Sequence, residues 1–391
     1  MPIRIEVAER RARLGRRHHL AREARAVDVA HAARSLVGLH GTDPATIYLS
    51  ARARVAGLTV DDLDRALYTD RSLVKHLAMR RTLFVFPTES LTYVQAGASN
   101  RVADTERRRL VREVEKAGLF DDGQRWLREA ADAVLDVLSG GEPMSYSALR
   151  EAIPILDGSM TYGEGRSWGG QVSIGPRVLT VLSAEGKIVR ATNDGAWRVS
   201  RNRWATTQSW LGRPIEPCAD GEGVAWLVRA WLRAFGPGTE DDVKWWLGAT
   251  ATAVRKALAA SDIATVDLDG RTGYLLADDL DPVRPVAPWA ALLPALDPTT
   301  MGWRARDWYL GPHKELLFDT NGNAGPTAWW DGRIVGGWWQ DEDGQVVLHL
   351  LEDVGSEARR HLEQEAEGLA QWLGGTRVMP RFPSPLAARR G

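Results

Sequence analysis

The spacing of apolar residues along this chain alternates between a helical period and a strand-like period, most clearly between residues 214 and 283. Three stretches there carry apolar side chains every three or four positions, which predicts three helices. Residues 263–268 and 271–276 follow, on either side of Asp269-Gly270. Because an Asp-Gly pair readily takes the positive φ angles of a two-residue turn, these segments are expected to form a hairpin. Helices followed by such a hairpin make up a winged helix, a shape that mostly binds nucleic acids.

The same succession of helices and paired strands occurs twice earlier in the chain. In the first unit, Asp43-Pro44 marks the start of a helix, because Asp is a good N-cap and Pro suits the first helical position. Other elements of this unit are predicted as helices over 29–39 and after Thr59, and as strands over 76–79 and 82–86. The second unit is predicted to contain helices over 125–138, 147–153 and 177–184, a loop over 157–175, and strands over 188–191 and 197–199.

After residue 282 the pattern changes to short strand-like segments separated by Gly-containing turns. Strands are predicted over 303–310, 316–318, 327–330, 334–338 and 346–350, and a last helix over 356–373. Short aromatic strands of this kind are typical of a small barrel or a curled sheet. We therefore predict an α+β protein with three tandem winged-helix modules and a C-terminal small β-barrel. The boundaries are 1–95, 96–213 (with a charged connector), 214–283 and 284–391 (barrel and C-terminal helix).

The charge of the chain is balanced overall but unevenly distributed. The formal net charge is −1, yet residues 1–112 hold 21 Lys and Arg against 12 Asp and Glu, and the remainder holds 29 against 39. A basic N-terminal part is typical of a protein that faces a polyanion, although such residues also serve as solvated helix faces. Phosphate contacts are expected where the arginines are densest, at Arg10, Arg11, Arg13, Arg16, Arg17, Arg22 and Arg25.

The composition argues against several kinds of protein. No apolar run approaches the roughly 18 residues that a membrane helix needs, and the Arg-rich N-terminus lacks the apolar segment of a secretory signal. The single cysteine, Cys218, excludes structural disulfides and cysteine-based zinc sites, so a cytoplasmic location is expected. No metal site is expected, and the neighbouring His18 and His19 are predicted to lie at the surface.

Two short glycine motifs are interpreted as chance matches. Residues 163–165, Gly-Glu-Gly, lack the third glycine and the preceding strand of a dinucleotide fingerprint. Residues 165–169 match Gly-x-Ser-x-Gly, but no buried strand precedes them and no helix follows, as a nucleophile elbow requires.

Residues 39–44, Leu-His-Gly-Thr-Asp-Pro, and residues 48–54, Tyr-Leu-Ser-Ala-Arg-Ala-Arg, place His, Thr and Asp at the mouth of a helix beside a basic surface. This arrangement resembles the signature of the AlkZ-like DNA glycosylases. Members of that family typically show Leu-Gln-x-Gln-Asp-Pro or Leu-Gln-x-Asp-x-Pro here, followed by a helix that carries Ala-Arg. Four further runs resemble family motifs: Met-Arg-Arg-Thr-Leu at 79–83, Leu-Leu-Pro-Ala-Leu-Asp-Pro at 292–298, Asp-Gly-Arg-Ile-Val-Gly at 331–336 and Arg-Phe-Pro-Ser-Pro at 381–385.

The resemblance implies three tandem winged helices and a β-barrel around a DNA channel. It also implies hydrolysis of the N-glycosidic bond of N7-alkylated purines in double-stranded DNA, without metal or cofactor. Alkylation at N7 gives the purine a positive charge, so the base leaves readily. The enzyme must then stabilise an oxocarbenium-like sugar and hold a water molecule beside the anomeric carbon.

The chain departs from the family at the two polar positions of this signature, which are His40 and Thr42 here. A neutral His40 can accept a proton from water, and the hydroxyl of Thr42 can hold the same water. Asp43 can stabilise the cationic sugar. The alternative is that Asp43 and Thr42 cap the helix while His40 fills a core position, and for Asp43 we favour the helix cap. Loss of both usual residues implies altered lesion choice, weak activity or none.

Candidate DNA contacts follow from the basic residues around these motifs. Arg80 and Arg81 lie at a predicted wing tip, where the family more often has a glycine, and the added charge favours DNA contact. For the others, plain solvation is a comparable alternative. They are Arg52 and Arg54 of the helix after the signature, and Arg304, Arg306 and His313 of a barrel hairpin that can enter the minor groove. Arg16 and Arg17 of the N-terminal cluster are further candidates, and the density of that cluster favours phosphate contact. Tryptophans between 197 and 339 can stack on bases but are expected mostly in the core.

The sequence therefore predicts a monomeric, cytoplasmic protein that binds double-stranded DNA and acts as a monofunctional DNA glycosylase. One alternative is a DNA-binding regulator that keeps the scaffold without catalysis. Another is a hydrolase of a different nucleic-acid or nucleoside substrate.

Overall fold

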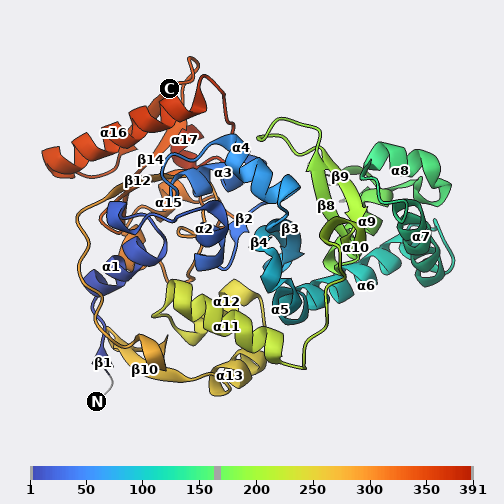
Figure 1. Cartoon of the computed structure of the whole chain (residues 1–391), viewed down its shortest axis with the longest axis horizontal. Coiled ribbons are helices and arrows are strands. Elements are labelled where there is room, and N and C mark those ends of the chain that lie inside the picture. The colour runs from blue at the N-terminus through green and yellow to red at the C-terminus, as the bar shows by residue number, and fades with distance from the viewer. Residues whose placement is uncertain (1–2, 163–168, 389–391) are drawn as a thin grey trace.

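The computed structural model describes residues 3–162 and 169–388, and two apolar cores organise it. One core gathers side chains from both halves of the chain, from Leu14 to Leu386. The other is formed by residues between Leu110 and Trp204 and lies in a lobe that projects from one end of the molecule (Figure 1).

The helices of the first unit begin where the sequence provides N-caps. Asp28 caps α2 (Val29–Ser35), Asp43 caps α3 (Pro44–Arg52), and Thr59 caps α4 (Val60–Asp64) through a capping box with Asp62. The starts predicted at Pro44 and after Thr59 are confirmed, whereas α2 ends earlier than predicted. The unit also contains α1 (Val7–Arg17), a π turn (Arg65–Thr69) and α5 (Leu91–Val94).

The predicted strand pairs of the first two units are joined in one six-stranded sheet, in the order β2-β4-β3-β8-β9-β5. The junction is made by Lys75 and Arg190, which are paired between β3 and β8. The strand predicted over 197–199 is wrong, because residues 194–201 form an irregular connection and pairing resumes only at Asn202. The strands are β2 (Leu39–His40), β3 (Leu73–Ala78), β4 (Thr82–Pro87), β5 (Met144–Ser145), β8 (Ile188–Asn193) and β9 (Asn202–Thr206).

The projecting lobe contains the helices of the second unit and the connector that leads into them (Figure 1). Part of the predicted loop over 157–175 is wrong, since β6 (Ser159–Tyr162) and β7 (Gly170–Ser173) pair there. Residues 163–168 lie outside the described part of the chain, so both short glycine motifs fall largely beyond it. The helices are α6 (Asn100–Lys116), α7 (Gly123–Leu138), α8 (Tyr146–Ala152), α9 (Gly175–Ala184) and α10 (Thr207–Leu211).

The third unit agrees with the sequence pattern. Helices α11 (Glu222–Phe235), α12 (Glu240–Leu247) and α13 (Ala251–Ala259) precede an antiparallel hairpin of β10 (Ile263–Leu268) and β11 (Arg271–Leu276). Asp269 and Gly270 take φ angles of 52° and 82°, as a two-residue turn with positive φ requires. A short strand, β1 (Ile3–Arg4), adds to β10 in parallel.

The C-terminal part is a four-stranded antiparallel sheet, in the order β12-β13-β14-β15, and the predicted closed barrel is wrong. The predicted strands over 303–310 and 316–318 are also wrong: α14 (Asp307–Leu310) and α15 (Lys314–Leu317) occupy these segments. Their aromatic side chains pack into the core from single helical turns, so tertiary packing overrides their strand propensity. The strands are β12 (Ala290–Leu293), β13 (Thr327–Trp330), β14 (Arg333–Gln340) and β15 (Val346–Leu350).

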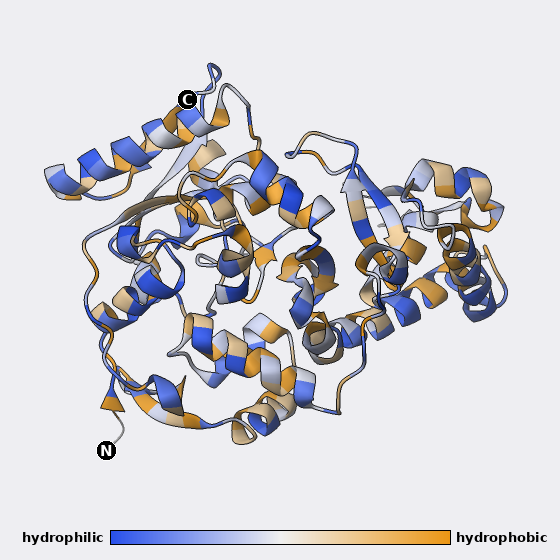
Figure 2. Ribbon diagram, viewed as in Figure 1, coloured by the Kyte–Doolittle hydropathy of each residue, from blue (hydrophilic) through white to orange (hydrophobic). Residues whose placement is uncertain are grey.

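Helix α16 (Gly355–Leu373) covers this sheet and confirms the predicted last helix. Its buried residues recur every three or four positions, while hydrophilic residues occupy much of its visible surface (Figure 2). The buried positions are Ala358, Leu362, Ala366, Leu369 and Leu373. A short helix, α17 (Pro385–Ala388), ends the described chain.

Candidate active site

The candidate catalytic residues lie where a two-residue strand turns into a helix. His40 ends β2 and lies opposite Phe84 of β4. The N–H of Gly41 donates to the carbonyl of Leu83 at 2.8 Å, which extends the pairing by one residue. The chain leaves the sheet at Thr42, so the edge of a sheet fixes one side of this turn and a helix start fixes the other.

Asp43 is held by two backbone groups. Its Oδ1 accepts a hydrogen bond from the N–H of Ala45 at 3.2 Å, and its Oδ2 accepts one from the N–H of Arg381 at 2.9 Å. The residue is buried. The helix-cap interpretation is therefore confirmed, and Asp43 also ties the C-terminal segment to the start of α3.

His40 is a buried, neutral imidazole. Its ring packs against Phe84 with 5.4 Å between centroids, and the N–H of Thr42 lies 3.5 Å from its Nδ1. Burial lowers the pKa of His40 to about 3, helped by the positive charge of Arg80 and opposed by Asp297. Since Nδ1 faces a donor, the ring proton belongs on Nε2. Nothing in the described part of the chain hydrogen-bonds to this Nε2.

Two arginines pack against one tryptophan beside this histidine. The guanidinium carbon of Arg80 lies 4.0 Å from the ring centroid of Trp245, and that of Arg306 lies 4.9 Å from the same centroid and 4.7 Å from that of Phe318. Arg80 adopts a φ of 53°, and Gly248 provides the space for its side chain. Among residues 3–162 and 169–388, neither guanidinium has a carboxylate at ion-pair distance.

This arginine pair brings two positive charges together without a carboxylate partner in the described part of the chain, while Nε of Arg306 donates to the carbonyl of Trp303 at 2.8 Å. The pKa of Arg80 is lowered to about 10 by partial desolvation and then by the charge of Arg306, so the side chain of Arg80 remains cationic at neutral pH. Together the two arginines place two positive charges on Trp245, close to His40. A phosphate group is the natural counter-charge for such a pair.

The other candidate contacts have partners within the protein. Arg81 and Arg304 keep exposed side chains, at 51% and 59%, so they remain open to a phosphate. The pairs are Arg81 with Glu106 (2.8 Å), Arg304 with Asp241 (3.9 Å), His313 with Glu352 (3.3 Å), Arg52 with Glu365 (3.4 Å), Arg17 with Asp279 (2.7 Å), and Arg16 with the carbonyl of Arg284 (3.2 Å).

Arg54 is not available to DNA in this structure. Its side chain has no exposed surface, and its Nη2 lies 2.7 Å from Oδ1 of the equally buried Asp297. It also donates to the carbonyl of Ser50 and to Oγ1 of Thr299, at 2.7 Å each. The expected phosphate contact is therefore replaced by an internal ion pair, because the i,i+4 face shared by Ser50 and Arg54 points into the core.

The predicted surface position of His18 is wrong as well. The ring is fully buried, and its Nε2–H donates to the carbonyl of Ala234 at 3.1 Å. Its Nδ1 accepts from Oγ1 of Thr299 at 2.8 Å, which connects it to Arg54. Burial and the nearby charge of Arg54 lower the pKa of His18 well below its usual value.

Much of the N-terminal arginine cluster also turns inward. Arg13 has only 1% of its side chain exposed and pairs with Glu9 and Asp279. Arg10 packs over Trp308, with 4.1 Å between the guanidinium carbon and the ring centroid. The charge excess of the first 112 residues therefore serves partly to join α1 to distant segments.

Two residues at the site were missed by sequence reasoning. Trp245 gave only a helical-spacing signal, and nothing in that spacing shows that two arginines from distant segments meet on its ring. Asp297 lies in the run 292–298, and the resemblance of this run to a family motif was the sequence signal that pointed to Asp297. In the structure, the carboxylate of Asp297 accepts hydrogen bonds from Ser50 of α3 and from Arg54 just after this helix.

The described residues show neither a metal-binding cluster nor a membrane-spanning helix. No group of three or more His, Cys, Asp or Glu side chains suited to hold a metal ion is found there. None of the helices in that part of the chain is long and apolar enough to cross a membrane.

Comparison with known proteins agrees with these motifs. The family model described as DNA glycosylase AlkZ-like matches residues 33–372. A protein of Streptomyces sahachiroi named interstrand DNA cross-link repair glycosylase is 27% identical over 180 residues, which span 44% of this chain and 47% of that protein. The solved structure of Streptomyces sahachiroi DNA glycosylase AlkZ superposes with a TM-score of 0.75 at 19% identity, over 97% of this chain and 100% of that one, so the two share a fold.

Proposed function

The chain belongs to the AlkZ-like DNA glycosylase family, and on this basis we propose that it hydrolyses the N-glycosidic bond of N7-alkylated purines in double-stranded DNA. The observation that carries the proposal is the position of a neutral His40, with an unoccupied Nε2–H, beside the unpaired cations Arg80 and Arg306. His40 can hold a water molecule, while Arg80 and Arg306 hold the charged backbone of the DNA.

His40 acts in this proposal by orienting water. A pKa of about 3 makes it a poor base at neutral pH, and the contact from Thr42 to Nδ1 directs its Nε2–H outward as a donor. A neutral side chain that donates one hydrogen bond is chemically close to the glutamine amide that the family carries at this position. The hydroxyl of Thr42, which is half-buried, supplies a second contact to the same water.

The reaction needs no strong base. The oxygen of water bonds to C1′ of the sugar while the C1′–N9 bond breaks, and the bonding electrons neutralise the positive charge of the alkylated purine. The extra proton of the attacking water passes to solvent. The protein contributes position and electrostatic stabilisation, and both are available from groups fixed by the sheet edge and by α3.

The DNA-binding face proposed here is centred on Arg80, Trp245 and Arg306. Arg81, Arg304 and His313 extend it, and Arg16, Arg17 and Arg52 are candidates at its margins. We further propose that the units 1–95, 96–213 and 214–283 are winged-helix modules, with 284–391 as a C-terminal module. The helices followed by hairpins in the first three units support this division.

The decisive experiment measures base release. The protein is incubated with duplex DNA that contains N7-methylguanine, the DNA is heated in alkali, and strand breaks at the lesion are counted. A duplex carrying an interstrand purine cross-link is tested in parallel, because the Streptomyces relative is named for such repair. Release that disappears in both His40→Ala and Thr42→Ala supports the proposal.

A second candidate is a DNA-binding protein without catalysis. The low exposure of His40, at 5%, favours this candidate, because the site must open further before the imidazole can contact the sugar of a damaged nucleotide. Salt-dependent duplex binding with no base release, over a panel of alkyl adducts, would establish this alternative.

A further inference from the structure

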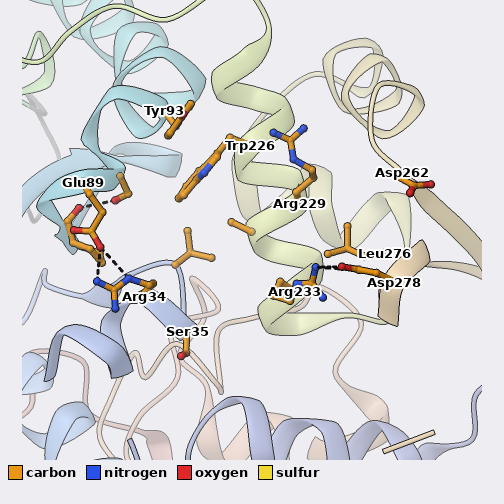
Figure 3. Close-up of a pocket in the computed structure, with 14 residues that line it drawn as sticks. Arg34, Ser35, Glu89, Tyr93, Trp226, Arg229, Arg233, Asp262, Leu276 and Asp278 are labelled. Carbon is orange, nitrogen blue, oxygen red and sulfur yellow. Dashed lines mark hydrogen bonds and ion pairs between the residues drawn. The ribbon is translucent and has the colours of Figure 1, made fainter. Parts of the chain in front are cut away.

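A cavity of about 580 Å³ lies apart from the His40 site, between the end of α2, the start of α5, α11 and the base of the β10–β11 hairpin (Figure 3). Neither His40 nor Thr42 lines it. Its volume falls within the range of roughly 300–1,000 Å³ that small-molecule sites occupy. Apolar groups form part of its wall, namely Val37, Pro87, Ala230 and Leu276.

One wall of this cavity is an aromatic platform. The rings of Tyr93 and Trp226 are stacked, with centroids 5.1 Å apart and planes inclined by 7°. Tyr93 covers one face of the indole, and Figure 3 shows the two side chains next to each other. Trp226 lines the cavity and is only half-buried, so part of its indole can contact a flat ligand there.

Four of the six charged side chains that line the cavity form ion pairs, and among the described residues the other two, Arg229 and Asp262, do not. Arg34 is bonded to Glu89 at 2.9 Å, and Arg233 is bonded to Asp278 at 2.7 Å, so these four side chains neutralise one another. Arg229 also lines the cavity, but in the described part of the chain no carboxylate lies within ion-pair distance of it. The protein thus leaves one guanidinium free at this place.

The free cation and the platform belong to the same helix face. Trp226 and Arg229 are three residues apart on α11, and side chains at this spacing are neighbours on a helix surface. Both side chains line the same cavity. A ligand that stacks on the indole therefore has its substituents within reach of the guanidinium.

From this arrangement we propose a second ligand site, specific for a nucleoside monophosphate, with the base stacked on Trp226 and the phosphate bound to Arg229. Base stacking on an aromatic side chain tolerates any base, and a guanidinium binds phosphate through two parallel hydrogen bonds. The nucleotide is either free or part of a single strand, and the chemistry recognised is the same. The site is independent of the proposed glycosylase activity.

Isothermal titration calorimetry with the full chain tests the site. Adenosine 5′-monophosphate should bind, and adenosine and inorganic phosphate should each bind at least about tenfold more weakly, because each lacks one of the two contacts. Trp226→Leu should weaken binding of the monophosphate at least about fivefold, while Trp226→Phe, which keeps a flat ring, should retain most of it. Arg229→Gln should reduce the affinity for the monophosphate to that for adenosine, and it should leave the affinity for adenosine unchanged.

Matched variants separate this site from the rest of the surface. Arg359→Gln and Arg360→Gln, at two exposed arginines of α16, should bind the monophosphate as the unchanged protein does. A short oligo-deoxyadenylate distinguishes a single strand from a free nucleotide as the ligand. If it binds more tightly than the monophosphate and loses affinity equally in Arg229→Gln, the ligand is a single strand. If the two affinities are equal, the ligand is the free nucleotide.

Two results overturn the site: no heat from the monophosphate up to about 10 mM, or binding that neither Trp226→Leu nor Arg229→Gln changes. If the protein binds the monophosphate but releases no base from duplex DNA, the proposed glycosylase function is refuted and the second ligand site is not.

Discussion

Arg54 and Asp297 form an ion pair with no exposed surface, in which Nη2 and Oδ1 are 2.7 Å apart. The pair joins α3, which begins just after the His40–Thr42 turn, to the segment that follows β12. Thr299 and Ser50 complete its hydrogen bonds. A buried pair of this kind is costly to break, because the remaining partner is left as an uncompensated charge.

Asp297→Asn should therefore lower the free energy of unfolding by about 3–5 kcal/mol. The substitution keeps the size of the side chain but leaves the buried guanidinium of Arg54 without its counter-charge. Urea unfolding at pH 7 measures the change. Arg16→Gln, whose arginine donates an exposed hydrogen bond to the carbonyl of Arg284, should stay within about 0.5 kcal/mol. Equal midpoints for Asp297→Asn and the unchanged protein would show that the pair contributes nothing.

Exchange of His40 separates an orienting role from a basic one. His40→Gln keeps a neutral hydrogen-bond donor and should retain base release within a few-fold, while His40→Ala should lose about 10- to 100-fold in kcat/KM. Single-turnover release of N7-methylguanine measures both. Equal loss in the two variants, with duplex affinity preserved, would mean that the imidazole acts as a base after all.

Stability should fall on acidification because three histidines are buried in the neutral form. Burial lowers the pKa of His40 to about 3, that of His76 to about 4, and that of His18 well below its usual value. Between about pH 6.5 and these lowered pKa values, the unfolded chain binds protons that the folded chain does not bind. The free energy of unfolding therefore has its full value above about pH 6.5 and decreases as the pH falls below it.

Each such histidine contributes a slope of about 1.4 kcal/mol per pH unit within this window. Urea unfolding at pH 7, 6 and 5 gives the total slope, and His40→Gln should reduce it by the share of one group. A slope that His40→Gln leaves unchanged would show that this imidazole is protonated equally in both states.

The arginine pair on Trp245 should govern the salt dependence of DNA binding. Arg80→Gln and Arg306→Gln should each weaken duplex binding and reduce the slope of log K against log salt by about 0.9, the share of one phosphate contact. Trp245→Leu should weaken binding as well, because both guanidiniums lose the ring that positions them.

Fluorescence anisotropy with a labelled duplex at several salt concentrations gives these slopes, and Arg360→Gln on α16 serves as the control. If both arginine variants lose one contact but Trp245→Leu binds normally, the tryptophan does not position them. If all three bind normally, the duplex lies on another face.

The sequence was sufficient where local chemistry decides structure. The third hairpin was predicted with its observed limits because Asp269-Gly270 specifies the turn by itself. The start of α3 at Pro44 followed in the same way from the cap residue Asp43. By contrast, residues 303–310 are rich in aromatic side chains that suit a strand or a core-facing turn equally well, and only the surrounding core selects the turn.

The linear pattern of this protein thus determined its third hairpin, the starts of α3 and α4 and the two polar residues that mark the candidate site. Tertiary structure decided which charges are available. Arg54 and Arg80 are both arginines next to signature residues, yet one is buried on Asp297 while the other packs, without a carboxylate partner, on Trp245. That difference depends on segments more than 150 residues away in sequence, whose approach no local spacing encodes.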